Sequence, residues 1–243
     1  MGRRVRSIRH GTDSSNRRIG GHIAARRKIA PVTAASTVAR VKRSKLVRNA
    51  EGWETISTDE HFANDHLAVA TEQVRTPLHS KPRSWTIARR KAAVVIAPMT
   101  RDGKIVLIRQ ERIPIRAAIW EMPSGQIDNS VTGVGDPAIQ KVALRELREE
   151  AGYELAAEGE LIALGYFFSS PGFTDERCYF FLARPVEPCA DFMRDETEAI
   201  LDCRPFAIDE LWRMIADNEI RDANTLGICA RLVARGLLSL GAG

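Results

Sequence analysis

The chain has 243 residues, of which 28% are charged, and a formal net charge of +5. This length is enough for one full hydrophobic core and an appendage. No apolar run approaches the roughly 18–20 residues of a membrane span, so we expect no membrane partner. The charge is unevenly divided, since residues 1–48 hold 14 Lys or Arg and one acid, whereas the remainder holds 22 basic and 30 acidic residues. The body is therefore acidic, and the high pI says nothing about what the body binds.

Residues 1–48 are rich in Arg, Ser, Ala and Gly and have no sustained hydrophobic period, which predicts a disordered basic tail. Two alternatives stay open, because such a stretch also resembles an organelle-targeting peptide and basic tails also tether proteins to nucleic acid or anionic surfaces. The tail has no aromatic residue to stack on bases, which makes it a poor candidate for nucleic-acid binding, and no other segment is one. The four cysteines form no Cys-x-x-Cys pair, as expected of reduced thiols. We therefore expect a cytoplasmic protein, with organelle targeting as the alternative.

Residues 49–91 form a small N-terminal β segment with two strand-like runs, 67–75 and 84–91. We predict the turn between them from Pro77 to Pro82, where two prolines, His79, Ser80 and Lys81 cluster. A two-stranded unit is marginal on its own. This segment is therefore expected to pack on the main domain or on a second subunit.

The main domain, residues 92–243, begins with an apolar strand, and the run Arg101-Asp102-Gly103-Lys104 predicts a hairpin turn into the next one. Asp222 has the position of an N-cap for the last helix. The predicted strands are 92–97, 105–110, 119–122, 161–169, 177–183 and 198–206, and the predicted helices are 138–151, 208–217 and 223–238. This order predicts an α+β fold in which a mixed β-sheet carries helices on both sides.

Glutamates gather at the end of the predicted helix 138–151. At about 100° per residue, Glu146 and Glu150 fall within the apolar stripe of that helix, which is formed by Ile139, Val142, Ala143 and Leu147. An ordinary surface helix turns its carboxylates away from the core, and burying two unpaired carboxylates costs several kcal/mol. Hard divalent cations with oxygen ligands, Mg²⁺ first, are the natural partners of such a pair. The stripe therefore predicts a metal site.

The run from Arg145 to Tyr153 resembles the second half of the Nudix box, Arg-Glu-aliphatic-x-Glu-Glu-x-Gly-hydrophobic, at every fixed position. The first half departs from the pattern. Pro137 stands where the family has a glutamate, and Asp136 is the nearest acid. Gly125 is the better match to the family's first glycine, with extra residues inserted after it. In the family that first glutamate contributes less to metal binding than the later ones, so the principal ligands remain.

Four segments of this chain, on either side of the box, resemble those of ADP-ribose pyrophosphatases. These segments are 109–114, 120–125, 170–176 and 220–225. This resemblance implies a Nudix-type α/β/α sandwich with a mixed β-sheet. It also implies Mg²⁺-dependent hydrolysis of ADP-ribose to AMP and ribose 5-phosphate, with Mn²⁺ as the second choice of ion. Two alternatives stay open. One is a nucleoside-diphosphate-sugar pyrophosphatase with the same ions, and the other is a weakened domain that binds a nucleotide and regulates, which the departure at Pro137 favours.

The resemblance assigns the metal-binding roles by position. Glu146 and Glu150 are expected to be direct ligands, with Glu149 assisting directly or through water. The matching main-chain ligand is the carbonyl of Ser124. Arg145 lies at i, i+4 from Glu149 and is expected to fix its carboxylate.

The acidic run 194–198 occupies the place where this subfamily carries further acidic residues. Glu196 and Glu198 are the candidates there, one as the base that activates water and one as an additional metal ligand, with Glu198 the candidate ligand. The alternative is a solvated acidic turn, since loops commonly carry charge.

Four residues resemble substrate contacts of the family. Arg112 resembles an arginine that grips the diphosphate, and Glu176 a residue that contacts substrate or the catalytic water. Trp85 resembles a tryptophan that stacks on adenine, with a half-buried strand aromatic as the alternative, and Arg89 is placed to reach phosphate or ribose. The family's tryptophan is sometimes supplied by the other subunit, so we expect a homodimer formed through the N-terminal strands.

Overall fold

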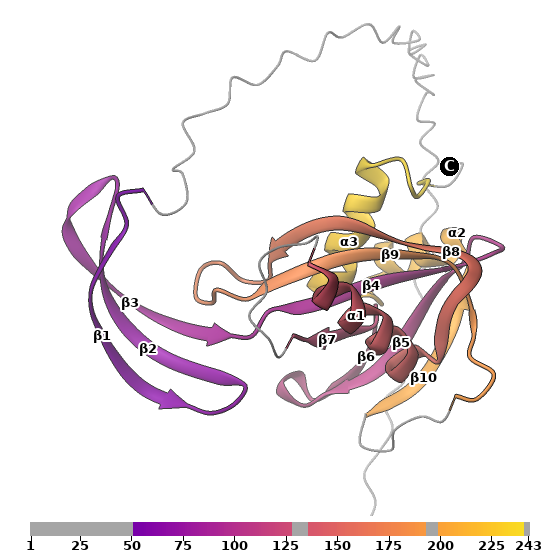
Figure 1. Cartoon of the computed structure of the whole chain (residues 1–243), viewed down its shortest axis with the longest axis horizontal. Coiled ribbons are helices and arrows are strands. Elements are labelled where there is room, and N and C mark those ends of the chain that lie inside the picture. The colour runs from indigo at the N-terminus through magenta and orange to yellow at the C-terminus, as the bar shows by residue number, and fades with distance from the viewer. Residues whose placement is uncertain (1–50, 128–135, 193–198, 241–243) are drawn as a thin grey trace, which may run out of the picture. The chain divides into compact units, whose positions relative to one another are not determined.

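The computed structural model describes residues 51–127, 136–192 and 199–240 (Figure 1). The predicted basic tail, residues 1–48, and the candidate residues Glu196 and Glu198 lie outside the described residues. Within the described ranges, no helix is long and apolar enough to cross a membrane.

The N-terminal β segment is a three-stranded antiparallel sheet in the order β1-β2-β3, with bounds Glu54–Ala63, Leu67–Thr76 and His79–Arg90. The two predicted strands are present, and β1 is an addition. The turn begins at Pro77 as predicted, but its predicted extent is wrong, because only two residues connect Thr76 to His79 and Pro82 lies within β3. A proline lacks the N–H of a ladder hydrogen bond and is tolerated at a sheet edge, and β3 is an edge strand of this sheet.

The main sheet has seven strands and mixed pairing (Figure 1). Its principal order is β10-β5-β4-β9-β8, while β6 pairs with β5 and β7 pairs with β4. The β4–β9 pair is parallel and the other pairs are antiparallel. The strands are β4 (Ala93–Thr100), β5 (Ile105–Arg112), β6 (Ala117–Glu121), β7 (Ser124–Gln126), β8 (Tyr153–Phe168), β9 (Arg177–Pro188) and β10 (Ile200–Phe206). The predicted mixed sheet is therefore confirmed.

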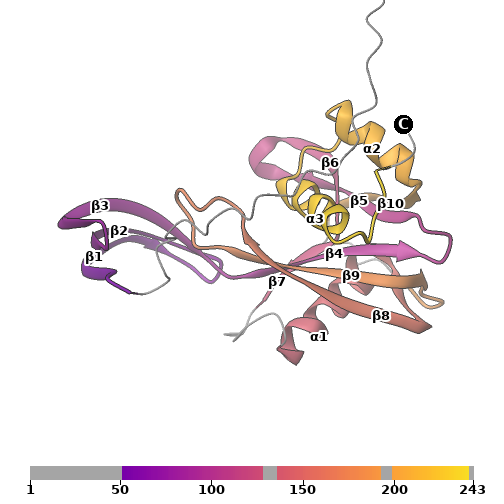
Figure 2. The same ribbon diagram turned by 90° about the horizontal axis from the view of Figure 1, so that it is seen from above.

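Helices cover both faces of this sheet (Figure 2). Because side chains alternate along a strand, β4 divides its apolar residues between two cores, with Val94 on one side and Val95 on the other. One core contains residues of α1 (Pro137–Glu146) and the π-helical turn η2 (Leu147–Ala151), and the other contains residues of α2 (Ile208–Ala216) and α3 (Ala223–Ala234). The chain thus has the expected α/β/α sandwich of the α+β class.

The N-terminal end of β4 is where the functional segments meet. Ala93 pairs with Gln126 of β7 on one side and with Cys178 of β9 on the other. Strand β3 ends three residues before β4 begins. The segments that carry Ser124 and Glu176 therefore flank the same end of the same central strand.

Candidate active site

The start of α1 explains the departure of this chain from the first half of the box. Asp136 is the N-cap and accepts a hydrogen bond of 2.9 Å from the Ala138 N–H. Pro137 occupies the first helical position, where its missing N–H leaves no intrahelical hydrogen bond unmade. Both residues therefore serve to begin the helix.

The end of the helix turns its glutamates inward. Glu146 is 6% exposed and Glu150 is 5% exposed, and both lie among the fully buried residues Ile139, Ala143 and Leu147. The predicted orientation of the stripe is confirmed. The last turn is the π-helix η2 rather than an α-helical turn, a widening that recurs at functional sites.

Arg145 and the backbone of Ser124 hold the three carboxylates. Arg145 donates one hydrogen bond of 2.5 Å to Glu149, as predicted, and a second of 2.6 Å to Glu146. The Ser124 N–H donates a hydrogen bond of 2.6 Å to Glu150. These hydrogen bonds fix the directions of the three carboxylates.

These carboxylates form an oxygen-rich site suited to a hard divalent ion. Glu146 and Glu150 are buried one helical turn apart, and the backbone of Ser124 adjoins Glu150. Across the described residues, no group of three or more His, Cys, Asp or Glu side chains is arranged to hold a metal. Among the described residues, an ion at this place could draw on the carboxylates of Glu146 and Glu150 and on main-chain oxygen, with Glu149 linked to Glu146 through Arg145.

An ion pair that was not predicted from the sequence joins a partly exposed arginine of β5 to a buried glutamate of β6. Glu121 is 2% exposed, and Arg112 donates from Nε to its Oε2 at 3.2 Å, while Nη2 lies 2.8 Å from Oε1. The geometry at Oε1 is not that of a hydrogen bond, so this oxygen has an ionic contact alone. The burial of Glu121 could have been predicted from the alternation of side chains along a strand, because Glu121 shares a face with the buried Ile119.

Burial raises the pKa of Glu121 to about 7. Loss of hydration is the main cause, the guanidinium of Arg112 opposes it, and the negative charge of Asp222 adds to it. A carboxyl group that changes charge near neutral pH thus lies against the arginine predicted to grip the diphosphate.

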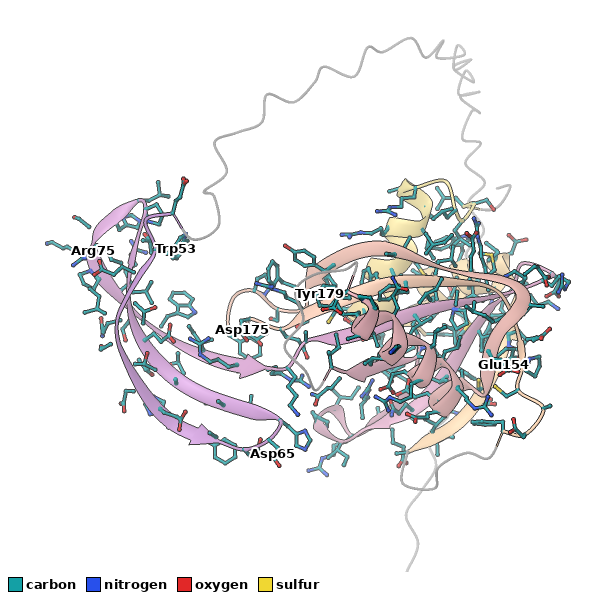
Figure 3. The ribbon with its side chains drawn as sticks, viewed as in Figure 1. Trp53, Asp65, Arg75, Glu154, Asp175 and Tyr179 are labelled. Carbon is teal, nitrogen blue, oxygen red and sulfur yellow. The ribbon has the colours of Figure 1, made fainter. Side chains whose placement is uncertain are left out.

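The predicted substrate residue Glu176 is buried at the start of β9. Its Oε2 accepts a hydrogen bond of 2.6 Å from the Ser169 hydroxyl, and its Oε1 lies 3.3 Å from Nη1 of Arg90. These contacts join β3 to the loop between β8 and β9. Asp175, labelled in Figure 3, precedes Glu176 in that loop and accepts a hydrogen bond from the Arg90 backbone N–H at 3.2 Å.

Trp85 and Arg89 also join β3 to that loop. The Trp85 indole N–H donates to the Gly172 carbonyl at 2.8 Å, while the residue remains 56% exposed. Arg89 makes ion pairs with the buried Glu72 and with Asp175, which raise the pKa of its guanidinium. Trp85 is thus largely exposed, whereas Arg89 already has two carboxylate partners.

A model of the NUDIX domain matches residues 88–226. The ADP-ribose pyrophosphatase of Bacillus subtilis (strain 168) is 27% identical over 172 residues, which cover 71% of this chain and 88% of that protein. The methanol dehydrogenase activator of Bacillus methanolicus is 29% identical over 173 residues, with the same coverage of 71% and 88%. The GDP-mannose pyrophosphatase of Klebsiella pneumoniae is 30% identical over 158 residues, covering 62% and 75%.

Among solved structures, an ADP compounds hydrolase matches with a TM-score of 0.61 over 79% of this chain and 100% of that chain. The sequence identity is 16%, so this likeness concerns the fold.

Proposed function

This chain belongs to the Nudix family of pyrophosphate hydrolases, and we propose that it hydrolyses ADP-ribose to AMP and ribose 5-phosphate with the help of Mg²⁺. The observation that carries the proposal is the pair of buried carboxylates, Glu146 and Glu150, at the end of the box helix. The similarity to an ADP-ribose pyrophosphatase over 88% of that protein supports the choice of substrate.

The metal would be held by Glu146, Glu150 and the carbonyl of Ser124, with Glu149 assisting. All of these donors are oxygens, as Mg²⁺ prefers, and Mn²⁺ is the second choice. When bound, the ion neutralises the charge of the diphosphate and lowers the pKa of a coordinated water. Arg145 keeps Glu146 and Glu149 in place through its two hydrogen bonds.

Substrate contacts are proposed for Arg112, Trp85, Arg89 and Glu176. Arg112 has a partly exposed guanidinium and a buried partner, Glu121, that fixes its direction, so it is suited to a diphosphate oxygen. The exposed ring of Trp85 is suited to stacking on adenine. Glu196 and Glu198, outside the described residues, stay the proposed base and additional ligand.

A second candidate substrate is a nucleoside-diphosphate sugar, because a GDP-mannose pyrophosphatase is 30% identical over 62% of this chain. The third alternative, a weakened domain that binds a nucleotide and regulates, rested on Pro137. The cap formed by Asp136 and Pro137 gives that departure a role in starting the helix, which leaves Glu146 and Glu150 unaffected and weakens the case for lost activity.

We further propose that the protein is a cytoplasmic homodimer joined through the N-terminal strands. Large apolar side chains are exposed in and beside the three-stranded sheet, as expected of an interaction surface; they include Trp53, Ile56, Phe62 and Trp85. Sedimentation equilibrium of the full chain should give twice the monomer mass, and Ile56→Glu should lower it. A monomer at micromolar concentrations would contradict the dimer.

A substrate panel tests the enzymatic proposal. The full chain, freed of metal with chelator and supplied with Mg²⁺, Mn²⁺ or no ion, is assayed with ADP-ribose, GDP-mannose and other sugar nucleotides by measuring nucleoside monophosphate. We expect turnover only with an ion present and the highest kcat/KM with ADP-ribose. A higher kcat/KM with a sugar nucleotide would reverse the order of substrates. Tight nucleotide binding without turnover of any compound would support the regulatory alternative.

A further inference from the structure

The motif at 220–225 has no part in the metal or substrate contacts above, yet its threonine is completely buried. Thr225 lies in the first turn of α3, which Asp222 caps by accepting a hydrogen bond of 2.8 Å from the Thr225 N–H. The Thr225 hydroxyl donates to the same carboxylate oxygen at 2.8 Å. It also accepts a hydrogen bond of 2.9 Å from the backbone N–H of Met122, 103 residues earlier. One hydroxyl therefore joins α3 to the strand segment that leads into the metal site.

Three successive residues of that segment are held by three different elements. The Met122 N–H is bound by Thr225 of α3, the Pro123 carbonyl accepts a hydrogen bond of 2.9 Å from Ile96 of β4, and the Ser124 N–H donates to Glu150 of η2. Pro123 has a fixed φ and no N–H of its own. The backbone position of Met122 therefore restricts the backbone position of Ser124.

We propose that Thr225 is a positioning residue for the metal site, which acts by fixing the Met122–Ser124 backbone and through it the carboxylate of Glu150. This inference rests on the proposed function for the identity of the metal site, and it goes beyond it by assigning a role to the first turn of α3. Groups that orient metal ligands through a hydrogen bond commonly change metal affinity by about 10- to 100-fold when they are removed.

Hydrogen exchange tests the positioning directly and needs neither metal nor substrate. Thr225→Val removes the hydroxyl at nearly constant volume, and Thr225→Ser keeps it. In Thr225→Val we expect faster exchange of the Ser124 amide, measured by NMR, and in Thr225→Ser exchange as in the unaltered chain. Unchanged exchange of Ser124 in a folded Thr225→Val variant would overturn the proposal. If Thr225→Val does not fold, hydrogen exchange of the unaltered chain provides the test. The amides of Met122 and Ser124 should then exchange through one common opening and be equally protected. Protection of the Met122 amide alone would overturn the proposal.

Metal binding tests the consequence for Glu150. Mn²⁺ titrated into the substrate-free chain and followed by electron paramagnetic resonance should bind about tenfold more weakly to Thr225→Val. The matched control is Leu232→Ala, which removes a buried side chain two turns further along α3 and should lower thermal stability without lowering Mn²⁺ affinity. An equal loss of affinity in both variants would mean that α3 acts only through general stability, and would overturn the proposal.

Steady-state kinetics complete the test. With ADP-ribose, Thr225→Val should lower kcat and raise the Mg²⁺ concentration needed for half-maximal rate, while KM for the substrate changes little. If the unaltered chain turns over no compound of the panel, the proposed function fails. The exchange experiment on Ser124 still decides the role of Thr225, so the two failures are distinguishable.

Discussion

Gly125 and Glu146 approach each other so closely that no side chain fits between them. A Cβ added to Gly125 would lie 2.0 Å from the Cδ and 2.2 Å from the Oε1 of Glu146, far inside van der Waals contact. The strand β7 therefore lies against the carboxylate end of Glu146, and a larger side chain at position 125 would displace this carboxylate. This contact gives a physical reason for the glycine that matches the first position of the box.

Gly125→Ala should displace the Glu146 carboxylate and lower turnover strongly. Overpacking of this kind costs about 1–3 kcal/mol of stability, and thermal unfolding measures that part. The matched control is Gly172→Ala, because a Cβ there would meet nothing within 4 Å. If the clash is the cause, adding Glu146→Ala to Gly125→Ala should restore part of the lost stability, as coupled neighbours do. If the effects of the two substitutions on stability were strictly additive, the clash would not be the cause.

Glu150→Gln tests the metal ligand that is held by Ser124. The amide oxygen can still accept the hydrogen bond from the Ser124 N–H, so the fold and its melting temperature should change little. The charge is lost, and a bound ion contributes several kcal/mol to the transition state, so kcat should fall by about 100-fold or more. Glu154→Gln is the control, since that partly exposed carboxylate pairs with Arg148 and has no assigned role in the site, so kcat should be normal. Near-normal turnover of Glu150→Gln would mean that another residue is the ligand.

Glu121 predicts a pH dependence of stability. Its pKa is raised from the ordinary value of 4.5 to about 7, so between these values the folded state binds more protons than the unfolded state. The contribution of this group to the free energy of unfolding is then greatest below pH 4.5 and is lost as the pH rises through 7. Denaturant titrations at a series of pH values should show this fall in the unaltered chain and a smaller one in Glu121→Gln. The same slope in both would contradict the raised pKa.

Deleting residues 1–48 should leave hydrolysis nearly unchanged, since every group assigned to the site lies at or after Trp85. The measurement is kcat/KM of the shortened chain with ADP-ribose and Mg²⁺. Its control is the oligomeric mass, because the deletion leaves β1–β3 intact. A large loss of specific activity in a correctly assembled chain would show that the basic tail takes part in binding the substrate.

The helix and its buried glutamates were predictable because a helical period fixes which residues share a face, and Glu146 and Glu150 follow that period into the core. The strand β1 was not predicted, because all of its residues are exposed and it has no alternation of apolar and polar positions. The first part of β8 was also not predicted, since the predicted strand began only at residue 161. Its first residues, beginning Tyr153-Glu154-Leu155-Ala156, favour helix as much as strand.

The parts of the site that escaped prediction depend on contacts between distant segments. Glu121 is buried against Arg112 because β5 and β6 form a hairpin, and its pKa is raised further by Asp222, about a hundred residues away. The Thr225 hydroxyl meets Met122 only because α3 packs against the sheet. A linear pattern contains the residue types in such contacts but not their pairing.

Substitutions of Asp136 distinguish a role of this residue in helix capping from a role in the metal site. As the N-cap of α1 it accepts the Ala138 N–H, and its replacement by alanine should lower the free energy of unfolding by about 1 kcal/mol. Asn caps as well as Asp but carries no charge. Asp136→Asn should therefore keep both stability and kcat, whereas Asp136→Ala should lose stability and keep most of its kcat. If Asp136 instead replaces the missing box glutamate at the metal, Asp136→Asn would lose activity at unchanged stability. Chemical denaturation and kcat with ADP-ribose, measured on the same preparations, distinguish these outcomes.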